Sequence, residues 1–178
     1  MARGPLTILA MCAAIEVAPM PLGQWSEVRQ LIDLGRWPSA LRAAQRESDP
    51  IARARACVEV LFGAGDLGGA LEVAREGLRS DPNDLVLLWR MAQISIDLRL
   101  GSVAAESVGR LERALVVTRP RAEDRDWWDS QLRSLRESQR DLSARESEIE
   151  AATQRARWTV VLGLGAWGIA LAVLARRA

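Results

Sequence analysis

Apolar residues recur three and four positions apart along most of the chain, a spacing that places them on one face of an α-helix. The pattern runs from residue 24 to residue 120, and breaks rich in Gly or Pro divide it into segments. It predicts three pairs of short helices, over 24–50, 51–82 and 83–120. We therefore expect an all-α protein.

The second pair has the clearest pattern, and residues 65–84 are its best-preserved part. A Gly-rich turn, 63–66, separates two apolar helix faces, and Ser80-Asp81-Pro82 ends the pair. Ser48-Asp49-Pro50 ends the first pair in the same way, about one repeat length earlier, which indicates an internal repeat. The glycines are typical of turns between helices, and Asp84 is placed to cap the helix that follows.

A long polar helix is predicted over 121–157, with one narrow apolar stripe. The stripe repeats every seven residues, at Trp128, Leu135, Leu142, Ile149 and Ala156. Such a stripe suits either a helix that caps the last repeat or a weak coiled-coil seam. We expect the start of this helix, at Trp127 and Trp128, to dock on the repeats and its later part to form a solvated stalk.

Residues 158–175 form an uncharged segment of eighteen residues with arginines on both sides. As a helix the segment is about 27 Å long, enough to cross the hydrocarbon core of a bilayer. It predicts one transmembrane helix followed by a short basic tail, 176–178. Gly168 and Ala172 have the spacing of small residues that allows close contact between membrane helices.

The first 23 residues resemble a secretory signal peptide. Arg3 precedes an apolar run, Leu6 to Ile15, and small residues that suit cleavage follow it. Glu16 lies close behind the run and fits this interpretation poorly, so an apolar helix packed on the repeats is the alternative. Cleavage would place the repeats in the periplasm, as part of a single-pass membrane protein with a cytoplasmic C-terminus.

Composition argues against an enzyme or a nucleic-acid-binding protein. The chain is 49% apolar and 26% charged, with a net charge of +1 and no histidine, and its 24 basic residues are all arginine. Acidic and basic residues are interleaved, whereas a nucleic-acid footprint needs clustered positive charge. Without His or Lys, neither a general base beside Cys57 nor a phosphate-binding loop at the glycines is supported. We predict no catalytic residues, no cofactor and no metal.

The helical spacing resembles the tetratricopeptide repeat (TPR), in which two antiparallel helices pack closely through small and large apolar positions. The second copy has Ala54, Cys57, Val58 and Leu61 where the family has Trp, Leu, Gly and Tyr. In its return helix, Ala70, Ala74, Gly77 and Pro82 stand where the family has Ala, Phe, Ala and Pro. The third copy matches at Leu88, Met91, Ala92 and Ser95. The family's Trp, Gly, Tyr and Phe positions are substituted, and the first copy is about two residues short.

The resemblance implies that the first helix of each pair lines a concave groove that binds a protein partner. By position, the groove would present Trp25, Arg29, Arg55, Glu59, Trp89, Arg90 and Gln93. Trp and Arg are frequent anchors at protein interfaces. The alternative is that the two tryptophans pack against the N-terminal segment or the long helix, and that the arginines are solvated.

These observations together predict a membrane-anchored TPR-like scaffold or adaptor that helps to assemble or organise a cell-envelope protein complex. Its layout is similar to that of the repeat proteins of bacterial aerotolerance (Bat) operons. Two other layouts stay open. One is a tail-anchored adaptor that faces the cytosol, similar in layout to the mitochondrial fission receptor, and the other is a small structural subunit of a larger membrane complex.

Overall fold

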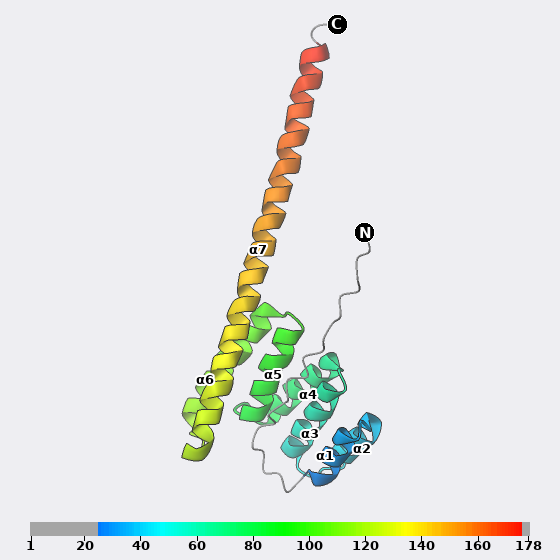
Figure 1. Ribbon diagram of the computed structural model, residues 1–178, viewed down its shortest axis with the longest axis vertical. Coiled ribbons are helices and arrows are strands. Elements are labelled where there is room, and N and C mark those ends of the chain that lie inside the picture. The colour runs from blue at the N-terminus through cyan, green and yellow to red at the C-terminus, as the bar shows by residue number, and fades with distance from the viewer. Residues whose placement is uncertain (1–24, 176–178) are drawn as a thin grey trace, which may run out of the picture.

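The computed structural model describes residues 25–175, with side chains from 25 to 160. The predicted signal segment, the basic tail, and the side chains of Gly168 and Ala172 lie outside the described residues. Within them the chain is entirely helical, which confirms the predicted all-α class (Figure 1). The helices are α1 (Ser26–Asp33), α2 (Trp37–Gln45), α3 (Pro50–Gly63), α4 (Leu67–Ser80), α5 (Leu85–Asp97), α6 (Gly101–Thr118) and α7 (Ala122–Ala175).

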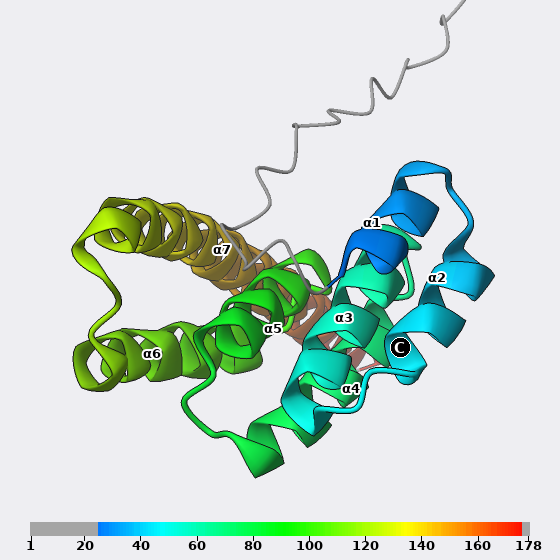
Figure 2. The same cartoon turned by 90° about the horizontal axis from the view of Figure 1, so that it is seen from below.

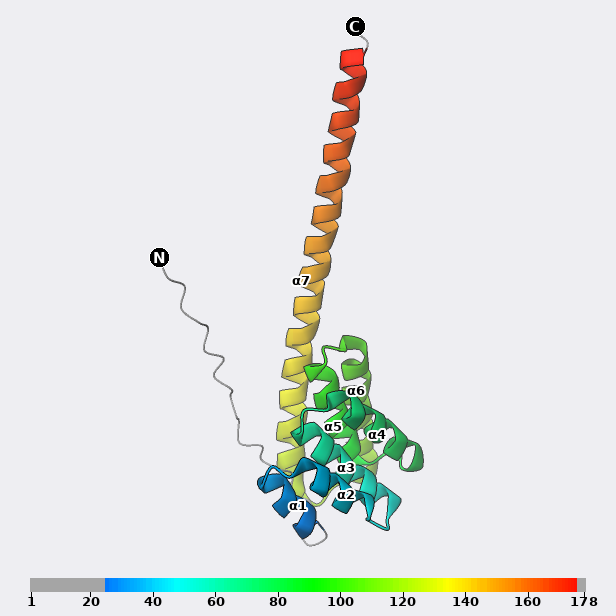
Figure 3. The same cartoon turned by 90° about the vertical axis from the view of Figure 1, so that its right-hand side faces the viewer.

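Each helix packs against the next one in the chain, so α1–α2, α3–α4 and α5–α6 form three hairpins. The odd-numbered helices also contact one another in order, α1 with α3, α3 with α5, and α5 with α7. Figure 2 shows the six short helices as one body with the start of α7 at its side. The rest of α7 extends far beyond that body (Figure 3).

Aspartates start three of the short helices. Asp49, Asp66 and Asp84 precede α3, α4 and α5, and each side chain accepts a hydrogen bond from a backbone N–H of the first turn. These N–H groups have no partner within the helix, so the caps stabilise each helix by about 1 kcal/mol. The prediction that Asp84 caps a helix is confirmed.

The three hairpins turn in the same way. Gly35, Gly65 and Arg99 have left-handed backbones, with φ of 66°, 81° and 56°. Each donates its N–H to the carbonyl three residues earlier, and the next residue donates to the carbonyl five residues earlier, at 2.8–3.0 Å. This is the Schellman motif, a common helix ending in which Gly is favoured. The repetition shows that the three hairpins are built alike, although the third has arginine at the left-handed position.

Small residues let the helices approach closely. Ala40, Ala44, Ala70 and Ala74 are fully buried on α2 and α4. At Gly77, a Cβ atom would lie 2.6 Å from Leu87 and 2.8 Å from Ala54, so α4 contacts both α3 and α5 at a point where only glycine fits. The larger apolar core spans α3 to α6 and the start of α7, and a smaller one joins α1, α2 and α3.

Helix α7 is one continuous helix through both the predicted stalk and the predicted span. Its first part is docked, because Trp128, Leu132, Leu135 and Leu142 are buried. Further along, the side chain of Ile149 is 65% exposed. No helix within the described residues is long and apolar enough for a membrane crossing. The side chains of the predicted span from residue 161 onward lie outside the described residues.

Candidate interaction surface

The shared turn gives a common frame for the residues predicted to line a groove. Trp25, Arg55 and Trp89 each lie ten residues before the left-handed turn residue of their hairpin. Arg29, Glu59 and Gln93 each lie six residues before it. The six residues therefore occupy two equivalent positions on the odd-numbered helices. Their surroundings nevertheless differ from one hairpin to the next.

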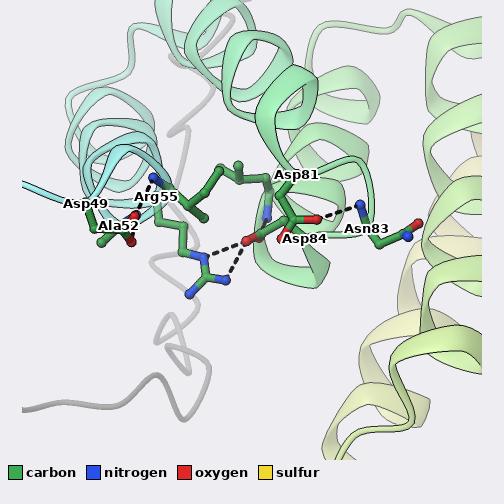
Figure 4. Close-up of polar contacts among 8 residues, drawn as sticks. Asp49, Ala52, Arg55, Asp81, Asn83 and Asp84 are labelled. Carbon is green, nitrogen blue, oxygen red and sulfur yellow. Dashed lines mark hydrogen bonds and ion pairs between the residues drawn. The ribbon is translucent and has the colours of Figure 1, made fainter.

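Arg55 connects the second hairpin to the third. Its Nε and Nη2 atoms donate to Oδ2 of Asp84 over 2.8 and 2.5 Å, as Figure 4 shows. The other carboxylate oxygen of Asp84 accepts from the N–H of Leu87 at 2.9 Å. The Asp84 side chain is fully buried, and that of Arg55 is 31% exposed. One carboxylate thus starts α5 and also ties α5 to α3, while part of the guanidinium stays accessible.

Glu59, Arg90 and Gln93 form a polar network between α3 and α5, in which Arg90 is buried and the other two residues are partly buried. Arg90 donates to both carboxylate oxygens of Glu59 at 2.5 Å, and to Oε1 of Gln93 at 2.7 Å. Its side chain is 2% exposed, and its guanidinium carbon lies 4.7 Å from the Phe62 ring centre and 4.2 Å from the Trp89 ring centre. A buried guanidinium is stabilised when it pairs with a carboxylate through two hydrogen bonds and lies between two aromatic faces.

Trp89 belongs to an aromatic cluster with the start of α7. It is 2% exposed and meets Trp127 edge to face, with ring centres 5.4 Å apart. Trp127 meets the buried Trp128 at 4.7 Å in the same manner. The indole N–H of Trp89 is buried without a hydrogen-bond acceptor among the described residues. The predicted docking of Trp127 and Trp128 on the repeats is confirmed.

Trp25 and Arg29 lie at the open end of the series. Trp25 is half-buried and borders a hollow of about 260 Å³ between α1, α2 and α3, together with Val28, Ala44 and Ala56. The Arg29 side chain is 46% exposed, and its one ion pair in the described structure is with the exposed Asp33 at 3.5 Å. Both side chains could contact a second molecule without disturbing the core.

The structure therefore corrects part of the predicted groove. Trp89 and Arg90 do not face an open surface, because α7 covers the first and Glu59, Phe62 and Trp89 enclose the second. Trp89 instead packs against the long helix, which is the alternative given above for this residue. Glu59 and Gln93 are partly buried and hold Arg90, so the side chains left for a partner are Trp25, Arg29 and the exposed part of Arg55.

Three contacts of this region are not visible in the sequence pattern. Asp84 is recognisable as a helix cap, but nothing near it indicates a partner 29 positions earlier in the chain. The other two contacts are that of Phe62 on α3 with Arg90 and that of Trp127 on α7 with Trp89. A buried arginine needs a carboxylate nearby, and that requirement is the one signal that could have linked Arg90 to Glu59.

Cys57 packs in the smaller core and is 7% exposed. Burial raises the pKa of its thiol, and the positive charge of Arg53 acts weakly in the opposite direction. A buried thiol with a raised pKa is a poor nucleophile. This placement agrees with a packing role for Cys57.

No protein-family model matches the chain, no curated protein matches its sequence, and no solved structure matches its fold.

Proposed function

We propose that the chain is a membrane-anchored, TPR-like scaffold that holds a protein partner and helps to organise a protein complex of the cell envelope. The repeated hairpin carries this proposal. Three hairpins with the same turn, whose first helices contact one another in order, are what a TPR-like array requires. Arrays of this kind build extended binding surfaces from equivalent positions of successive repeats.

The partner surface that we propose lies on the first hairpin and the adjoining side of α3. It consists of Trp25, Arg29 and the exposed part of Arg55, which combine an amphipathic aromatic ring with two guanidinium groups. Their chemistry suits a partner segment that carries an apolar side chain next to carboxylates. The network of Glu59, Arg90 and Gln93 ties α3 to α5 next to this surface.

Membrane attachment is the second part of the proposal, and the sequence of 158–175 supports it. Eighteen uncharged residues continue α7 and have Arg155 and Arg157 before them and Arg176 and Arg177 after them. Together with the signal-like first 23 residues, this layout puts the repeats outside the cytoplasm. The docked helix α7 would then hold the repeats at a fixed distance from the bilayer.

The binding surface can be tested by photo-crosslinking in cells. A photoreactive amino acid replaces Arg29 on α1 or, as a matched control, Arg42 on α2, which is another exposed arginine of the same hairpin. We expect discrete crosslinked products from position 29 and none of them from position 42. Equal products from both positions, or none from either, would contradict a partner site on the odd-numbered helices.

The membrane arrangement needs a separate test. N-terminal sequencing of the membrane-extracted protein reports processing, and protease treatment from each side of the membrane reports topology. We expect a shortened N-terminus, repeats accessible only from outside the cytoplasm, and release into the soluble fraction when 158–178 is deleted. An intact N-terminus with repeats accessible from the cytoplasm would instead support the tail-anchored adaptor.

A further inference from the structure

A seven-residue apolar spacing runs through both the docked part and the exposed part of α7. Trp128, Leu135 and Leu142, seven residues apart, are buried against the repeats. The same seven-residue spacing continues with Ile149 and Ala156, whose side chains are exposed. The apolar stripe that docks on the body therefore continues beyond the end of the body.

Contact with the body ends near Glu146. Its carboxylate lies against Gly101, the first residue of α6, so closely that a Cβ atom at Gly101 would collide with it. The start of α6 has no side-chain cap, and a carboxylate there is favourable because it meets the positive end of the helix dipole. From Ser147 to Val160 every side chain is exposed.

The exposed segment nevertheless has the pattern of a paired helix. Ile149, Thr153, Ala156 and Val160 are separated by four, three and four residues, which places them on one face. Thr153 and Ala156 are small enough for a second helix to approach closely. Helices without tertiary packing are only marginally stable in water, so covering this face would stabilise the segment.

We propose that a second copy of this chain covers the face, so that two α7 helices pair in parallel through Ile149, Thr153, Ala156 and Val160. Charge complementarity favours this occupant. Arg145 and Glu150 flank the seam on opposite sides and are five residues apart, the separation at which flanking residues of two parallel helices meet. Each Arg145 then lies opposite the other copy's Glu150. Among the described residues, no ion pair engages either side chain.

The proposal goes beyond the proposed function, because it does not depend on what the repeats bind. Pairing would join two sets of repeats and present two copies of the surface around Arg29. A partner with two matching segments would then bind with an avidity that a single copy lacks.

Cysteine crosslinking of the full chain in cells tests the pairing. Ile149→Cys and Ala156→Cys place a thiol in the seam, and Ser147→Cys places one on the opposite face of the same turn as the matched control. The unsubstituted chain, with Cys12 and Cys57, gives the background. Because a disulfide needs Cα atoms within about 7 Å, we expect at least about tenfold more dimer from the seam positions than from Ser147→Cys.

Charge exchange tests the identity of the occupant and the register. With Ile149→Cys present, Arg145→Glu should reduce the dimer severalfold, because two carboxylates then face each other. Adding Glu150→Arg should restore it, since the exchanged pair is again complementary. Equal crosslinking from Ser147→Cys, no dimer, an adduct of a mass other than twice the chain, or no restoration by the exchange would each overturn the proposal.

Discussion

Helices α1 and α5 hold the same place in their hairpins but have opposite surroundings. Ten residues before each turn stands a tryptophan, which is half-buried as Trp25, directly before α1, and 2% exposed as Trp89, within α5. Helix α1 has 8 residues and is covered by α2 and α3, whereas α5 has 13 and contacts α3, α4, α6 and α7. The two tryptophans share one repeat position, and the number of neighbouring helices decides whether each of them is core or surface.

The comparison suggests that one end of the array contributes to stability and the other to binding. Around α5, an aromatic cluster and a buried ion pair hold α3, α5 and α7 together. Around α1, the Arg29–Asp33 pair is exposed, and Trp25 packs half-buried at the edge of the smaller core. We therefore expect substitutions at α5 to affect stability and equivalent substitutions at α1 to affect binding.

The tryptophan pair should show the largest difference. Trp89→Ala would leave a large cavity beneath α7 and should reduce the free energy of unfolding by about 3 to 5 kcal/mol. Trp25→Ala should reduce it by about 1 kcal/mol or less, because the ring is already partly hydrated. Urea titrations followed by far-UV circular dichroism measure both, and the photo-crosslinking at position 29 provides the binding readout. Similar losses of stability would show that α7 does not protect Trp89.

The acidic residues give the second contrast. Glu59→Ala leaves the buried guanidinium of Arg90 without its carboxylate and should destabilise the fold by at least about 3 kcal/mol. Asp33→Ala breaks the exposed pair with Arg29 and should cost less than about 1 kcal/mol. The double variant Glu59→Ala/Arg90→Met separates the two contributions, since it removes the unpaired charge and should recover part of the lost stability. No recovery would mean that packing, rather than charge, determines the loss.

The sequence was sufficient for the helices but not for the contacts between them. Helical spacing and the Ser-Asp-Pro breaks located all six short helices, because helix periodicity and capping are local properties. The predicted exposure of Trp89 and Arg90 in the groove was wrong. Their burial depends on α7 and on Glu59, which are far away in the chain. Local pattern also missed the left-handed Arg99, since the residue type that marks such a turn is glycine.

That turn provides the third contrast. A residue with a Cβ atom is strained in the left-handed region by about 1 kcal/mol, so Arg99→Gly should stabilise the third hairpin by about that amount. Gly35→Ala should destabilise the first hairpin by a similar amount, and its cause would be backbone strain because no atom lies near the added Cβ. Melting temperatures of the two variants should move in opposite directions. A loss of stability in Arg99→Gly would show that the arginine side chain contributes more than its backbone costs.

The smallest contrast concerns the aspartates that end the two helices. Asp33 has Arg29 one turn earlier, whereas Asp97 has Gln93 in that place and lies at the negative end of α5. Although Asp97 is an exposed residue, partial desolvation raises the pKa of its carboxyl above the ordinary value. The folded state therefore binds this proton more tightly than the unfolded state does, and the resulting stability is lost as the pH rises from the ordinary aspartate range through the raised pKa. Asp97→Asn should stabilise the protein by about half a kcal/mol at pH 7, and this advantage should disappear toward pH 4. Asp33→Asn should be slightly destabilising at pH 7, because it removes the ion pair with Arg29. Urea titrations at both pH values measure the difference, and a constant advantage of Asp97→Asn across them would mean that the carboxyl does not titrate differently on folding.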